Sequence, residues 1–187
     1  MAQAKGLRLG LVGLLGCGLL ACGPTNTLAT GGSITLDMVD AGSFGAERLQ
    51  LSATGRNVTG NVLARTASAQ NSRIAIHGQT ENYGDQNDTT LQQAVSVDLY
   101  DIPTAGQRLT LTPIIPDNAM EASVDYEERL NGRTFQWTSD MGTLVIDEVS
   151  GGKLVFHTEG GHLQPRGNGA GLATFTLSVT VDEVNGL

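Results

Sequence analysis

The sequence has few of the residues that most often point to a function. It contains two cysteines in 187 residues, both within the first 22 positions, so a disulfide framework is excluded and a hydrophobic core alone must stabilise the rest of the chain. Aromatic residues make up 4% of the chain, a thin supply for a surface that binds sugars by stacking. After residue 21 no apolar run reaches the roughly 20 residues that a membrane-spanning helix needs.

Basic residues are also scarce. The chain has 11 Lys and Arg against 19 Asp and Glu, and a chain that began at Cys22 would lose Lys5 and Arg8 and carry a formal net charge of −10. Phosphates and anionic lipid headgroups repel such a surface. The composition therefore predicts no nucleic-acid partner and no electrostatic docking on a membrane.

The first 21 residues predict a secretory signal peptide. Lys5 and Arg8 form a short basic start, and the uncharged apolar run 9–21 follows. A membrane-spanning helix is the alternative, but the run is too short and four glycines weaken it as a helix. We expect this segment to be removed on export.

The end of the run resembles the lipobox of bacterial lipoproteins. Its residues are Leu19-Leu20-Ala21-Cys22. The resemblance implies that the Cys22 thiol receives a diacylglyceryl group and that the chain is cut before Cys22. Two or three acyl chains would then hold the domain at the bilayer, since each buried methylene contributes about 0.8 kcal/mol.

Cys17 is the alternative lipidation site, because Leu14-Leu15-Gly16-Cys17 fits the same pattern. Cleavage before Cys17 would leave a second, free thiol in an oxidising envelope. Cleavage before Cys22 leaves none, and it leaves a polar start suited to a flexible tether. We therefore favour Cys22.

The predicted organisation is a signal peptide at 1–21, a lipidated tether at 22–32 and a single domain at 33–187. The residue after Cys22 is Gly23, not the aspartate that marks inner-membrane retention in some Gram-negative bacteria. The expected location is the cell envelope, with the outer membrane favoured over the inner membrane.

The region from 33 on alternates apolar and polar residues with the period of a half-buried strand. The strongest run is Ala173, Phe175, Leu177, Val179 and Val181, against Thr, Ser and Asp between them. Shorter runs lie near residues 34–38, 49–53, 74–76, 95–99 and 109–111. Short strands separated by turns predict an all-β fold, an antiparallel β-sandwich (Ig-like or jelly-roll-like) built largely of consecutive hairpins.

Residues 116–132 fit either a helix capped by Asp117 or a hairpin strand. The hairpin is favoured because Asn131-Gly132 is a strong two-residue turn signal. It would pair 120–128 with 133–139 and place Tyr126 opposite Trp137 on the apolar face. We further expect a turn at 139–142 and a glycine-rich loop at 160–171.

Two motifs carry oxygen or nitrogen ligands. His157, Glu159 and His162 form a weak candidate metal site, since no known zinc spacing matches them. Asp85-Gln86-Asn87-Asp88 is an oxygen-rich candidate calcium loop, but it lacks the ligand order of an EF-hand, so a plain polar loop is favoured. The sequence therefore predicts no cofactor and no bound metal.

Catalytic motifs are equally sparse. Gly42-Ser43-Phe44-Gly45 has Ala41 where a nucleophile elbow needs glycine, although three histidines leave a Ser-His-Asp arrangement open. Trp137, Tyr126 and Phe135 are expected in the core, and Tyr83 and Tyr100 are the aromatic residues expected at the surface.

The sequence therefore favours a lipid-anchored envelope protein with a non-enzymatic binding or structural domain, whose protein or glycan partner it does not name. The alternatives are an envelope hydrolase and a glycan- or metal-binding module. Glycan binding would use exposed aromatic side chains.

Overall fold

The structure, a computed structural model, describes residues 31–39, 48–51, 58–64, 72–167 and 171–187, and within these ranges it contains ten strands and no helix. The strands are β1 (Gly32–Val39), β2 (Arg48–Leu51), β3 (Val58–Ala64), β4 (Ser72–Gln79), β5 (Gln92–Leu99), β6 (Arg108–Leu111), β7 (Glu121–Leu130), β8 (Arg133–Ser150), β9 (Lys153–Arg166) and β10 (Ala173–Val181). The predicted all-β class is confirmed.

Alternation in the sequence explains why these segments are strands. In β10 the apolar residues Phe175, Leu177 and Val179 are at most 3% exposed, whereas the intervening Thr176 and Ser178 face solvent. β1 repeats the pattern with buried Ile34, Leu36 and Met38. One face of each strand therefore packs on the core, as the period of two requires.

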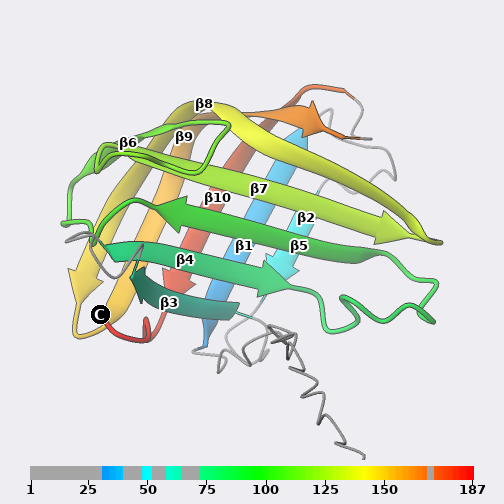
Figure 1. Cartoon of the computed structure of the whole chain (residues 1–187), viewed down its shortest axis with the longest axis horizontal. Helices are drawn as coiled ribbons and strands as arrows, with labels where there is room; N and C mark the ends of the chain where they lie inside the picture. The colour runs from blue at the N-terminus through cyan, green and yellow to red at the C-terminus, as the bar shows by residue number, and fades with distance from the viewer. Residues whose placement is uncertain (1–30, 40–47, 52–57, 65–71, 168–170) are drawn as a thin grey trace, which may run out of the picture.

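The strands form one continuous sheet in the order β2-β1-β10-β9-β8-β6-β7-β5-β4-β3, with an additional β7–β8 pairing (Figure 1). All pairs are antiparallel except β6 with β7, which is parallel. The prediction of a purely antiparallel sheet is therefore corrected at that pair. Two separate sheets, which a sandwich requires, are not seen among the described strands.

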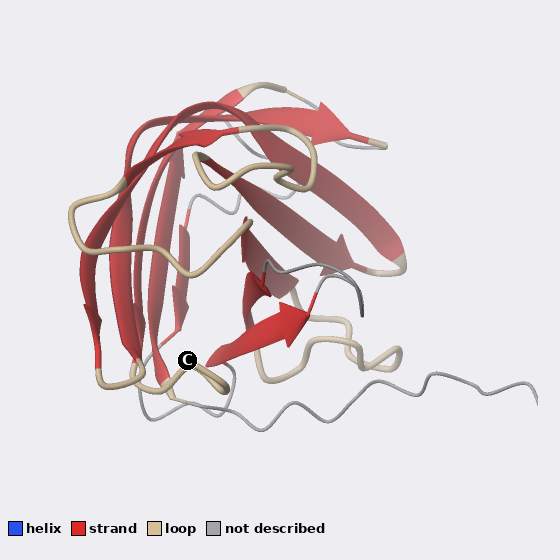
Figure 2. Ribbon diagram, turned by 60° about the vertical axis from the view of Figure 1, so that its left-hand side comes forward, coloured by secondary structure: helices blue, strands red, loops and turns tan. Residues whose placement is uncertain are grey.

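The long strand β8 lets the sheet curl. Its first residues pair with β7, and residues from Gln136 on pair with β9. Figure 2 shows the result, with strands on both sides of one interior. A single hydrophobic cluster fills that interior and takes side chains from β1 and from β3 to β10. The opposite face of the sheet, which we call the outer face, is therefore the one that meets solvent.

The predicted hairpin about Asn131-Gly132 is confirmed in its register. Leu130 pairs with Arg133 and Tyr126 pairs with Trp137. Asn131 and Gly132 both have positive φ (49° and 74°), as a type I′ turn demands. The helical alternative for this segment is wrong.

The predicted turn at 139–142 is wrong, since β8 runs through it, and the predicted loop at 160–171 is wrong as far as Arg166, where β9 ends. Residues 168–170 of that loop lie outside the described residues. The glycines instead allow a close approach at β-bulges. A Cβ on Gly142 would lie 2.9 Å from the Gly160 carbonyl oxygen, and one on Gly161 would lie 2.6 Å from the Phe175 ring. Glycine at these two positions leaves room where strands approach closely, and the strands continue through it.

The predicted signal peptide and both candidate lipidation sites, Cys17 and Cys22, lie outside the described residues, as does the Gly42-Ser43-Phe44-Gly45 segment. Strand β1 begins at Gly32, the last residue of the predicted tether. Within the described ranges, no helix is long and apolar enough to cross a membrane.

Candidate functional site

Polar side chains gather on the outer face of β4, β5, β7, β8 and β9. Residues that are paired across antiparallel strands lie on the same face, so the register aligns them in rows. One row is His77, Ser96, Asp125 and Thr138, and the next is Gln79, Ala94, Glu127, Gln136 and Arg166. The two rows place nine residues from five strands on one patch of the sheet.

A hollow of about 410 Å³ lies over these rows, and we call it the outer-face pocket. Its polar lining consists of His77, Tyr83, Ser96, Asp125, Glu127, Gln136 and Arg166. Six of the seven stand on strands, and only Tyr83 comes from a loop. Rigid strands therefore fix most of the geometry, as a preformed site requires.

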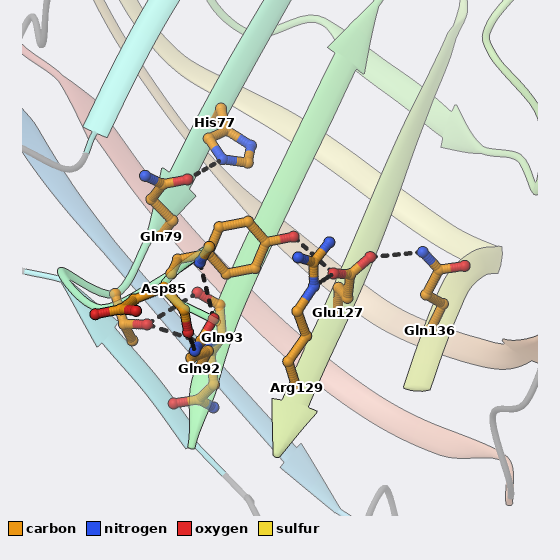
Figure 3. A network of polar contacts seen from close by, with 11 residues as sticks. His77, Gln79, Asp85, Gln92, Gln93, Glu127, Arg129 and Gln136 are labelled. Carbon is orange, nitrogen blue, oxygen red and sulfur yellow. Dashed lines mark hydrogen bonds and ion pairs between the residues drawn. The ribbon is translucent and has the colours of Figure 1, made fainter. Parts of the chain in front are cut away.

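Glu127 is the centre of the hydrogen-bond network. The Tyr83 hydroxyl donates to its Oε1 at 2.6 Å, Gln136 Nε2 donates to its Oε2 at 2.5 Å, and Arg129 pairs with Oε1. Figure 3 shows Arg129 and Gln136 approaching the carboxylate from opposite sides. Burial alone would raise the pKa of Glu127, but these hydrogen bonds and the Arg129 charge outweigh it and lower the pKa. The carboxylate is therefore held in its charged form.

Tyr83 reaches the pocket because Gln92 holds its loop in place. The Gly84 amide donates to Gln92 Oε1 at 2.8 Å, and Gln92 Nε2 donates to the Asp85 carbonyl at 2.6 Å. The Arg129 guanidinium stacks 4.7 Å from the Tyr83 ring centre. Burial, followed by the hydrogen bond and charge of Glu127, raises the pKa of Tyr83. The phenol therefore stays a hydrogen-bond donor.

His77 links Ser96 to Gln79. Its Nδ1 lies 2.9 Å from Ser96 Oγ, and its Nε2 lies 3.0 Å from Gln79 Oε1 (Figure 3 shows the Gln79 contact). The Tyr83 ring meets the imidazole edge-on, with 6.4 Å between ring centres. The imidazole is thus held by both ring nitrogens and by an aromatic contact.

Asp125 is the second carboxylate of the pocket. Burial raises its pKa, although the hydrogen bond with Thr138 and the charge of Arg166 oppose this. Arg166 Nη1 lies 3.7 Å from Asp125 Oδ1. The pKa of Asp125 is therefore raised and that of Glu127 lowered, although the two residues lie only two positions apart on one strand.

A second hollow of about 390 Å³ lies beside the loop that carries Tyr83. Loop residues 84–86 and Asp88, together with residues 130–132, supply much of its lining, and its charged side chains are Asp85, Asp88 and Arg129. Asp85 and Asp88, the candidate calcium ligands, accept hydrogen bonds from Asn87 and Thr90 within this loop. These bonds are those of ordinary Asx turns.

The candidate metal ligands His157, Glu159 and His162 all lie on β9, but their nearest partners are other residues. His157 Nδ1 lies 2.8 Å from Asp147, His162 Nδ1 lies 2.5 Å from Asp140, and Glu159 pairs with Arg108. Only His157 and Glu159 approach each other, at 3.7 Å. No set of three or more His, Cys, Asp or Glu is placed to bind a metal within the described ranges.

Of the aromatic residues singled out in the sequence, Trp137, Tyr126 and Phe135 are buried as predicted. Tyr83 and Tyr100 are half-buried, not exposed. Sequence reasoning missed His77, Ser96 and Gln79, because their only signal is alternation in two short strands. The register between β4 and β5 brings these residues together. The sequence does not reveal that register, because a twelve-residue loop at 80–91 separates the two strands.

No protein-family model matches the chain, and neither a curated protein nor a solved structure matches it significantly.

Proposed function

We propose that this protein is a cell-envelope lipoprotein, anchored through Cys22, whose β domain binds an uncharged, hydroxyl-rich ligand in the outer-face pocket. The single observation that supports the binding role is the pocket itself. It gathers seven polar side chains from five strands and one loop. A solvated sheet face without a ligand needs no such convergence.

The chemistry of the lining favours hydroxyl groups. Asp125 and Glu127 can accept hydrogen bonds, and Gln136 and Arg166 can donate them, so each ligand hydroxyl can be matched in both senses. The formal net charge of −8 disfavours an anionic ligand. Neutral sugars are the class that fits both conditions.

The location is proposed from the lipobox-like residues at 19–22 and from Gly23, which favours the outer membrane. We also propose, as the finer form of the fold, that the two halves of the curled sheet act as the two layers of a sandwich. An experimental structure would test this last point through the strand pairings at the sheet edges.

The anchor is tested by metabolic labelling with a fatty acid. Cys22→Ala should abolish labelling and release the protein from the membrane fraction, whereas Cys17→Ala should keep both. The reverse result would move the lipidation site to Cys17. Fractionation of inner and outer membranes then tests the location.

The binding role is tested by NMR titration of the isotope-labelled full-length chain in detergent with chitotriose, cellotriose and maltotriose at millimolar concentration. We expect one of them to shift amide signals of β5, β7 and β8. Asp125→Asn should weaken that binding about tenfold or more, the loss expected for a charged hydrogen bond. The matched control Asp147→Asn, on β8 and outside the pocket, should leave it unchanged. No shift with any of the three sugars would contradict the proposed ligand class.

A further inference from the structure

We propose that the outer-face pocket also carries a nucleophile, Ser96, which His77 activates as general base and Gln79 positions, and that it cleaves carboxylic esters. The inference rests on the proposed pocket but needs neither the lipid anchor nor the sugar. It extends the binding role to a reaction, the hydrolysis of an acyl ester seated beside Ser96.

The geometry supplies the three positions that an activated serine requires. A nucleophile must lie within hydrogen-bond reach of a base, and the base must be oriented by a third group. Ser96 Oγ lies 2.9 Å from His77 Nδ1, and His77 Nε2 lies 3.0 Å from Gln79 Oε1. Adjacent strands in fixed register hold Ser96 opposite His77, and Gln79 is two residues further along β4.

The Gln79 carbonyl oxygen decides the direction of the chain of hydrogen bonds. An amide oxygen only accepts, so Nε2 must carry the imidazole proton. Nδ1 is then the free acceptor, and the Ser96 hydroxyl must donate to it. This is the direction in which a histidine removes the proton of a nucleophile.

The surroundings fit the role. Ser96 and His77 are both half-buried and both line the 410 Å³ pocket, so a substrate can reach them. The edge of the Tyr83 ring restricts rotation of the imidazole. Arg166 lines the same pocket, with its guanidinium 3.7 Å from Asp125, and is the side chain to which we assign stabilisation of the developing oxyanion.

The reaction balances without a further reagent. Ser96 Oγ attacks the ester carbonyl carbon as its proton passes to His77 Nδ1. The bond between the carbonyl carbon and the alcohol oxygen breaks, and His77 returns the proton to the leaving alkoxide. Water then attacks the acyl-Ser96 ester, gives its proton to His77, and the acid departs as Ser96 Oγ recovers the proton.

The chain contains a matched control. Ser178 on β10 also faces a histidine, His157, across an antiparallel pair. There, however, Asp147 lies against His157 Nδ1 at 2.8 Å. Comparing Ser178 with Ser96 therefore distinguishes a serine that only lies opposite a histidine from a serine that is hydrogen-bonded to one.

The test treats the full-length chain in detergent with a fluorophosphonate probe and with p-nitrophenyl acetate. We expect one covalent adduct per chain, mapped to Ser96. Ser96→Ala should abolish it, His77→Gln should slow labelling and ester hydrolysis about 100-fold or more, and Gln79→Leu should slow both by a smaller factor. Ser178→Ala should label like the parent, and Gln79→Glu, which keeps an acceptor, should restore most of the rate.

The tautomer of His77 gives an independent readout by ¹⁵N NMR. Protonated Nε2 supports the proposal, and protonated Nδ1 overturns it. An adduct elsewhere, no adduct on a folded chain, or labelling that ignores His77 also overturns it. Sugar binding by a Ser96→Ala variant that no longer labels leaves both proposals standing. If the parent binds sugar but Ser96 is not labelled, only the proposal that Ser96 is a nucleophile is overturned. If Ser96 is labelled but no sugar binds, only the proposed ligand class is overturned.

Discussion

A tyrosine–glutamate pair lies on each face of strand β7, with both glutamates and Tyr126 on the strand itself and Tyr83 on the loop 80–91. On the inner face the Tyr126 hydroxyl donates to Glu128 Oε1 at 2.9 Å, and on the outer face the Tyr83 hydroxyl donates to Glu127 Oε1 at 2.6 Å. Glu127 and Glu128 are neighbours in sequence, yet Glu128 is 0% exposed and lies against the core. The same chemical pair is thus placed in two different environments.

The two glutamates differ in their hydrogen bonds and in the direction of their pKa shifts. Glu127 has three donors, and its pKa is lowered although burial opposes this. Burial raises the pKa of Glu128, which the single hydrogen bond from Tyr126 does not offset, and its Oε2 has no hydrogen-bond partner within the described structure. The outer face therefore keeps a carboxylate in its charged form, while the inner face tolerates a polar group inside a packed core.

The largest expected effect is on the inner face, at Trp137. Its side chain is fully buried, 5.7 Å from the Tyr126 ring and 6.4 Å from the Phe135 ring, measured between centres. Trp137→Ala should lower the free energy of unfolding by about 3–5 kcal/mol, the usual range for emptying an aromatic site. Urea unfolding followed by circular dichroism measures this. Trp137→Phe should cost less, and an Ala variant as stable as the parent would place Trp137 outside the core.

This inner face is the part of the molecule that the sequence predicts best. Alternation put Tyr126 and Trp137 on one side, and the Asn131-Gly132 turn fixed their register, because both signals are local and agree. The turn predicted at 139–142 failed for a physical reason. Gly142 serves a close strand approach there, and a glycine needed for space has the same sequence signal as one needed for a turn.

The outer-face pocket was much harder to predict. His77, Ser96 and Glu127 look like ordinary solvent-side residues in their own strands. Their proximity depends on the order β4-β5-β7, which the loop 80–91 and the β6 strand interrupt in sequence. Long-range pairing of this kind leaves no local pattern. The sequence likewise drew attention to His157 and His162, whose nearest partners prove to be separate aspartates.

A smaller effect compares the two tyrosines directly. Tyr126→Phe removes the donor to buried Glu128 and the acceptor of the Gln93 Nε2 hydrogen bond (2.7 Å). Leaving the buried Glu128 carboxyl without this hydrogen bond should cost about 1–3 kcal/mol of unfolding free energy. Tyr83→Phe should cost about 0.5–1.5 kcal/mol, because Arg129 and Gln136 still satisfy Glu127. Equal losses in urea unfolding would show that burial does not distinguish the two pairs.

The smallest effect is a difference in pH dependence between the two glutamates. The pKa of Glu127 is lowered on folding, so its ionisation adds stability above its ordinary pKa of 4.5, and this stability is lost as pH falls through the folded-state pKa. The pKa of Glu128 is raised, so its contribution is present below 4.5 and is lost as pH rises through the folded-state pKa. Removing each group by Gln should therefore have opposite consequences.

The stability deficit of Glu127→Gln should shrink as pH falls below about 4.5, and Glu128→Gln should gain on the parent as pH rises above it. Urea unfolding at a series of pH values from about 3.5 to about 8, which spans the usual range of glutamate titration, measures both curves. If the stability difference between parent and variant changed with pH in the same direction for both variants, the two faces of β7 would not shift the pKa values of their carboxyl groups in opposite directions. That result would contradict the conclusion that the outer-face pocket holds the Glu127 carboxylate in its charged form.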